Sequence, residues 1–123
     1  MHRHLLATAV CLVLVGCSTR SATPSPFDTD VAATGRIQLQ VENMDFNDAT
    51  LHAVTDGGRE RIGTVSGKGQ DTFTIEWPFT RDLRVEINLL ASDRYTTPRL
   101  TVSPGERVRL RITTPLNRSF LIR

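Results

Sequence analysis

The chain has 123 residues, of which 39% are hydrophobic, and its 15 Lys and Arg residues against 13 Asp and Glu residues give a formal net charge of +2. So small a charge provides no global field to attract nucleic acid or another polyanion, so a nucleic-acid partner is not expected. This length allows one small domain in addition to any targeting segment.

The first 17 residues have the three-part layout of an export signal. Arg3 and the amino terminus supply positive charge, residues 5–15 are apolar except for Thr8, and Gly16 and Cys17 follow. A membrane-spanning helix needs about 20 apolar residues, so this run is too short to cross a bilayer. An ordinary cleaved signal is the alternative, but residues 14–16 fit its A-x-A cleavage pattern poorly.

At residues 14–17 the chain resembles the bacterial lipoprotein family, whose lipobox is matched at every position by Leu14, Val15, Gly16 and Cys17. The resemblance implies diacylglycerol on the Cys17 thiol, cleavage before Cys17 and acylation of the new amino terminus, which anchor a protein stably in a bilayer. Ser18 stands where an Asp favours retention in the inner membrane. The implied location is therefore the bacterial cell envelope, at the outer membrane and facing the periplasm.

Processing at this point would make residues 1–16 a lipoprotein signal peptide and residues 17–35 the lipidated cysteine with a flexible linker. The linker holds Pro24 and Pro26 among Ser, Thr and Ala residues, and it has too few large apolar residues to fold. The mature chain would keep His52 as its last histidine and would have no free thiol, so we expect no metal site and no cofactor.

Residues 36–123 change character and predict an all-β domain. Apolar and polar residues alternate as they do in half-buried strands, and Gly-rich segments such as Asp56-Gly57-Gly58 and Ser66-Gly67-Lys68-Gly69 separate them as turns. The expected strands cover residues 36–42, 50–55, 61–65, 72–77, 83–90, 99–102 and 107–112. We expect the fifth to be central, while residues 120–122 form an eighth strand or pack over an open end.

About seven short strands separated by turns predict a small antiparallel β-sandwich, with a small β-barrel as the alternative. The strand spacing and the Pro104-Gly105 turn resemble an immunoglobulin-like sandwich of the bacterial kind, although the cysteine pair of antibody domains is absent. This resemblance implies a fold and no particular activity, because one fold supports many functions.

Three arginines, Arg107, Arg109 and Arg111, alternate with apolar residues and so lie on one face of one strand, roughly 7 Å apart. One interpretation is a partner-binding stripe for phosphates or carboxylates, such as lipid head groups or an acidic partner. The other, more usual for exposed charges, is a solvated face with cross-strand ion pairs. The carboxylates considered as partners are Glu42, Glu76 and Glu86.

Two further segments contain candidate binding residues. Trp77 and Phe79 flank a proline at a strand end; we expect Trp77 to fill the core, and an exposed Phe79 would suit a protein or glycan contact. Asp45, Asn47 and Asp48 offer oxygens to a cation, but the calcium-loop pattern is missing. Bonds to nearby backbone are therefore the expected role of these loop residues.

The residues supply no recognised catalytic set, so we expect no enzyme. Ser66, for example, does not lie in a G-x-S-x-G motif. The sequence favours a membrane-anchored, non-enzymatic binding or assembly module of the bacterial envelope, with an envelope protein or glycan as the partner. The alternative is a module that binds a small ligand or glycan through residues 43–48 and 77–79, and a hydrolase ranks last.

Overall fold

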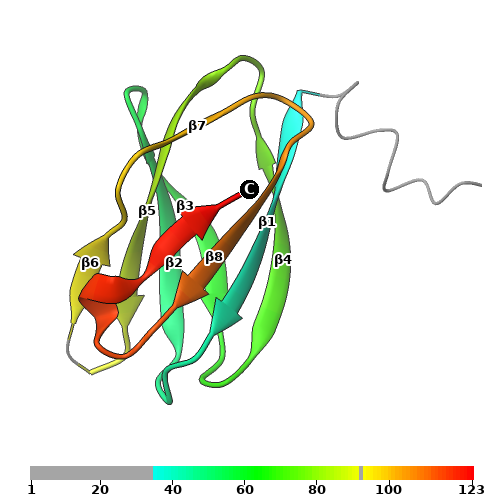
Figure 1. Cartoon of the computed structure of the whole chain (residues 1–123). Helices are drawn as coiled ribbons and strands as arrows, with labels where there is room; N and C mark the ends of the chain where they lie inside the picture. The colour runs from blue at the N-terminus through cyan, green and yellow to red at the C-terminus, as the bar shows by residue number, and fades with distance from the viewer. Residues whose placement is uncertain (1–34, 92) are drawn as a thin grey trace, which may run out of the picture.

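The computed structural model describes residues 35–91 and 93–123, and these contain nine strands and one short 3-10 turn, Leu116–Arg118. The strands form two sheets packed face to face (Figure 1), which confirms the all-β sandwich rather than the alternative barrel. The predicted signal peptide, Cys17 and nearly all of the predicted linker lie outside the described residues. No helix in the described part of the chain is long and apolar enough to cross a membrane.

The first sheet, sheet A, has the strand order β4-β1-β8-β9. Its strands are β1 (Arg36–Asn43), β4 (Gln70–Glu76), β8 (Arg107–Ile112) and β9 (Phe120–Ile122). The pairs β1–β4 and β8–β9 are antiparallel, as predicted, but β1 and β8 are parallel. The reason is that the chain returns from the other sheet at the end where β1 begins, where Gly105 N donates to Arg36 O over 2.7 Å. From there β8 has to run in the same direction as β1.

The second sheet, sheet B, has the strand order β3-β2-β5-β6, with β7 also paired to β5. Its strands are β2 (Ala49–Thr55), β3 (Gly58–Val65), β5 (Arg81–Leu89), β6 (Arg94–Thr96) and β7 (Leu100–Val102). The prediction that the strand at 83–90 is central is confirmed, because β2 pairs along one side of β5 and the two short strands share its other side. The sequence did not predict β6. Residues 120–122 form β9, which confirms the prediction that they add a strand beyond the seven expected.

The core lies between the sheets and consists of the inward-facing apolar residues of both. Fully buried examples are Leu39 and Leu110 from sheet A and Leu51, Leu83 and Ile87 from sheet B. Strict alternation within each strand places these side chains inside and their polar neighbours outside. The core is therefore the product of the same pattern that predicted the strands.

Trp77 links the two sheets, as a residue that follows β4 of sheet A and reaches β7 of sheet B. Its side chain is 0% exposed, and its indole Nε1 donates a hydrogen bond to Val102 O over 2.9 Å. A buried indole needs such a partner for its N–H group. The prediction that Trp77 belongs to the core is confirmed.

Gly67 lies where the β3–β4 turn meets the loop between β1 and β2. A Cβ atom at this position would lie 1.9 Å from Phe46 O, and Gly67 N donates to Asp48 Oδ1 over 2.9 Å. Because the clashing atom belongs to the backbone, the loop has to move to admit any side chain. Glycine is therefore required here by contact rather than by its backbone angles.

We expect Gly67→Ala to lower the free energy of unfolding by about 1–3 kcal/mol, since it overpacks a fixed backbone contact. Gly57→Ala is the matched control, because its Cβ would meet its nearest neighbour, Thr55 Oγ1, at an ordinary 3.6 Å. Urea unfolding of both variants and the parent measures the difference. Equal stability of the two variants would contradict the proposed contact.

Candidate functional site

The three predicted arginines lie together on the outer face of sheet A. Arg107, Arg109 and Arg111 are all exposed, and the residues between them are buried. β8 is an interior strand, so this row has β1 on one side and β9 on the other. The prediction that the three arginines share one face is confirmed.

One of the predicted cross-strand ion pairs forms on this face. Arg111 donates through Nε and Nη2 to Glu42 Oε2, each over 3.0 Å. Glu76 pairs with Arg36 instead, over 2.9 Å, and Glu86 belongs to the other sheet. The ion-pair interpretation is therefore confirmed for Arg111 with Glu42, whereas Glu76 and Glu86 have other partners.

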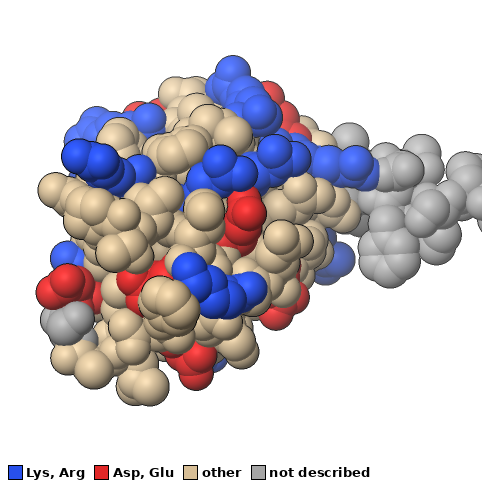
Figure 2. Space-filling view, turned by 60° about the horizontal axis from the view of Figure 1, so that its bottom comes forward, with Lys and Arg blue, Asp and Glu red and all other residues tan. Residues whose placement is uncertain are grey.

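Two apolar side chains flank the arginine row on β9. Ile122 lies opposite Arg109 and Phe120 opposite Arg111, and they are 39% and 37% exposed. Figure 2 shows Lys and Arg side chains as a broken band across the upper part of the view, with most of the Asp and Glu side chains below it. The outer face of sheet A thus combines positive charge with apolar surface.

A groove of about 590 Å³ lies on the β1 side of the same row. It is lined by Gln40, Val41, Glu42, Gln70, Asp71, Thr72 and Arg109. Two carboxylates line it together with the guanidinium of Arg109. Because both charge signs are present, the groove is no selective pocket for an anion.

Phe79, the other predicted contact residue, lies at the end of the sandwich where the described chain begins. Its side chain is 59% exposed, and the Arg81 guanidinium lies 5.3 Å from the centre of its ring and 4.2 Å from that of Trp77. Trp77 N donates to Gly35 O at this end. Phe79 is therefore exposed to solvent, whereas the buried Trp77 side chain is not accessible to a partner.

Residues 43–48 form a loop at the opposite end, and its polar side chains bond to nearby groups as predicted. Asn43 Nδ2 donates to Asn47 O and Ser66 O, while Asp45 accepts from Asn47 N over 2.9 Å and from Thr114 Oγ1 over 2.7 Å. These bonds, that from Asn47 N first, hold the pKa of Asp45 below its usual value. Within residues 35–91 and 93–123, no three His, Cys, Asp or Glu side chains gather as metal ligands would.

The two loops named for the alternative ligand site do not lie together. β1 runs from the Arg36 end to residue 43, and its antiparallel partner β4 runs back to residue 76 before residues 77–79. A strand of eight residues separates the two loops by roughly 25 Å. Sequence distance did not reveal this, because the separation follows from the pairing of β1 with β4.

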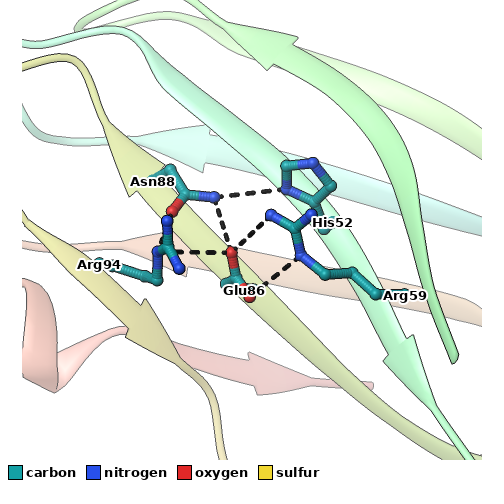
Figure 3. A network of polar contacts seen from close by, with 5 residues as sticks. All are labelled: His52, Arg59, Glu86, Asn88 and Arg94. Carbon is teal, nitrogen blue, oxygen red and sulfur yellow. Dashed lines mark hydrogen bonds and ion pairs between the residues drawn. The ribbon is translucent and has the colours of Figure 1, made fainter.

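A polar network that the sequence did not reveal lies on the outer face of sheet B (Figure 3). Glu86 of β5 accepts from Arg59 of β3 through both oxygens, at 2.8 and 3.2 Å. Asn88 Nδ2 donates to Glu86 Oε1 over 2.9 Å and lies 3.3 Å from His52 Nδ1. Arg94 Nε donates to Asn88 Oδ1 over 2.7 Å and lies 3.7 Å from Glu86 Oε1. Four strands thus contribute to a single cluster.

The network fixes the protonation states of its members. Hydrogen bonds from Arg59 and then from Asn88 lower the pKa of Glu86 to about 2, although the outward-pointing carboxylate is only 12% exposed. Burial, and next the charge of Arg59, lowers the pKa of His52. At neutral pH the cluster therefore holds an ionised carboxylate, and the lowered pKa of His52 favours its uncharged imidazole.

The same face carries more positive than negative charge. Arg61 lies opposite His52 and donates to Thr64 Oγ1, and Arg84 lies opposite Val54; among the described residues no carboxylate pairs with Arg84. With Arg59 and Arg94 this makes four arginines against two carboxylates, Glu86 and Asp82. The Asp82 carboxylate accepts a hydrogen bond from Thr101 Oγ1. We call this surface the network face.

The comparisons with known proteins bear on the fold. No family model matches the chain, and no curated protein matches it. A solution NMR structure of a protein from Eubacterium rectale superposes with a TM-score of 0.52 over 73% of this chain and 89% of that chain, at 10% sequence identity. At this identity the similarity shows a shared fold alone.

We expect acid to destabilise the protein partly through Glu86. The pKa of Glu86 is about 2 in the folded protein and about 4.5 in the unfolded chain. The resulting contribution to the free energy of unfolding is up to about 3 kcal/mol. It is present above pH 4.5 and is lost as the pH falls towards 2. Glu86→Gln should remove this part of the pH dependence in urea unfolding at several pH values. Glu76→Gln is the control, because the Glu76 carboxylate is 68% exposed, and it should leave the pH dependence of stability unchanged. If the free energy of unfolding changes with pH equally in the parent and in Glu86→Gln, Glu86 does not have this role.

Proposed function

We propose that this chain is a lipid-anchored protein of the bacterial envelope whose β-sandwich binds a carboxylate-bearing protein partner through the network face, without catalysis. The observation that carries the proposal is the Glu86 carboxylate, held by Arg59 beneath a surface with an excess of arginine. The anchor is Cys17, and the proposed site is the periplasmic side of the outer membrane.

The state of Glu86 supports binding rather than acid–base chemistry. A carboxylate whose pKa is about 2 stays ionised under any physiological condition, whereas a general acid or base works best with a pKa near the operating pH. Its role is to hold guanidinium groups in place. Such side chains lose less conformational entropy when a partner docks, which favours affinity.

The arginines of the network keep donors for a partner. Arg59 uses Nε and Nη2 on Glu86, and a guanidinium carries five N–H donors in a planar fork that matches a carboxylate. The side chains of Arg59 and Arg94 are 48% and 71% exposed. Together with Arg61 and Arg84 they form a surface four strands wide, which suits an acidic protein segment, and arginine is enriched at protein interfaces.

The position of the linker supports this choice of face. The described chain begins at Gly35, directly before β1 of sheet A. The network face belongs to sheet B, on the other side of the sandwich (Figure 1). A tether that joins sheet A leaves the network face open to a partner.

Cys17→Ala should release the protein from the membrane fraction, because the acyl chains that hold it can no longer be attached. Membranes are sedimented before and after a high-salt wash, and the protein is detected in each fraction; circular dichroism checks that the β domain is still folded. Ser18→Ala, at the next residue, should remain membrane-bound. Retention of Cys17→Ala after the wash would show that lipid does not hold the protein.

Thr96 is exposed on β6 and lies opposite Glu86. A photoreactive residue at this position should crosslink in intact cells to one envelope protein with an acidic segment. Replacing both Arg61 and Arg84 by Gln should reduce the yield several-fold, because each removes a charge from the docking surface. The matched control places the same residue at Thr74, exposed on β4 of sheet A, and should not give this adduct. Recovery of only bulk lipid, glycan or abundant porins at Thr96 would overturn the proposal.

A further inference from the structure

We propose that the outer surface of β8 and β9 lies against the anionic phospholipid head groups of the membrane that carries the protein. This lipid face consists of Arg107, Arg109, Arg111, Phe120 and Ile122. The inference goes beyond the proposed function, which concerns the network face, and rests on it only for the anchor that brings the domain to the bilayer.

The charge of the face is suited to a surface of phosphates. Arg111 shares its charge with Glu42, but among the described residues no carboxylate pairs with Arg109. Glu42 and Asp71 border the row on the β1 side, and the β9 side offers apolar residues instead of acids. An anionic membrane surface attracts each nearby arginine without requiring one fixed geometry.

The apolar residues favour lipid over an acidic protein as the occupant. Phe120 and Ile122 stand next to Arg111 and Arg109 in register, so each of these two arginines has an exposed apolar neighbour. Surfaces that lie in the head-group region combine basic side chains with apolar ones that reach the acyl boundary. Carboxylates of a protein partner would use the charge and leave the apolar area unmatched.

The attachment point of the proposed tether lies beside this face. β1, where the described chain begins, is the direct neighbour of β8, and the turn before β8 is bonded to the start of β1 through Gly105 N and Arg36 O. In Figure 2 the band of basic side chains extends to the side where the described chain begins. A short tether raises the effective concentration of head groups at this face, so weak individual contacts suffice.

The lipid face and the network face point in opposite directions, because they are the outer faces of two packed sheets. With the lipid face on the membrane, the network face is directed away from the membrane. The arginines of the two faces then have different tasks: one set orients the domain and the other recognises the partner.

The first experiment uses the full chain with Cys17→Ala, so that no acyl chain contributes. Binding to vesicles of phosphatidylcholine alone is compared with binding to vesicles that also contain phosphatidylglycerol, by flotation at low and high salt. We expect a preference for the anionic vesicles that disappears at high salt. Arg109→Gln should reduce this preference about fivefold, the effect of one arginine near an anionic surface.

Arg84→Gln is the matched control, because it removes the same charge from the opposite face. The apolar segment at residues 5–15 is common to all variants and cancels from the ratio between the two kinds of vesicle. Equal binding to both kinds, or an equal loss in Arg84→Gln and Arg109→Gln, would overturn the inference. This result does not depend on acylation, so it separates failure of the lipid face from failure of the anchor.

The second experiment measures orientation in the membrane-bound protein with its own anchor. A fluorophore is attached at Thr74→Cys on sheet A or at Thr96→Cys on sheet B, both exposed positions, in vesicles that carry a nitroxide on the lipid head group. Quenching should be several-fold stronger at position 74, and Arg109→Gln should reduce the difference. Equal quenching, or stronger quenching at position 96, would show that another face meets the membrane.

Discussion

The parallel pairing of β1 with β8 determines which residues of this sandwich share a surface. It joins segments far apart in the chain, so that Gln40 lies beside Arg109 and Glu42 beside Arg111. Because the two strands start at the same end, the beginning of the described chain, the turn bonded to Arg36 and the first arginine of β8 lie together. The same pairing lets β9 add its apolar residues along the other side of β8. Both the composition of sheet A's outer face and its closeness to the start of the described chain follow from this one contact.

The two outer faces use arginine under different physical conditions. On sheet B a nearly buried carboxylate binds Arg59 through both oxygens, and Asn88 connects it to Arg94. This costs desolvation of Glu86, and the ionised state is kept because hydrogen bonds outweigh the burial. On the outer face of sheet A the pair of Arg111 with Glu42 is more exposed, and such pairs hold their side chains weakly. Fixed guanidinium groups suit a partner of defined shape, and loosely held ones suit a surface without fixed shape.

Much of the fold could be predicted because alternation is a property of single segments. The arginine row was predicted correctly for the same reason, since one strand contains all three residues. The network face could not be predicted: Arg59 and Glu86 are 27 positions apart, and each is an ordinary charged residue in its own strand. What brings them together is the register of β2 with β3 and with β5. The parallel pair was missed because period-two patterns carry no information on direction.

The interrupted edge of sheet B has a consequence for how copies of this chain can associate. Along β5 two strands of three residues replace one continuous strand, and between them Thr97 bonds to Val85 through both its backbone N–H and its side-chain oxygen. A broken edge offers no long row of free amides and carbonyls on which a second copy can add a strand. Neighbouring copies therefore meet an edge that resists sheet extension and aggregation on this side.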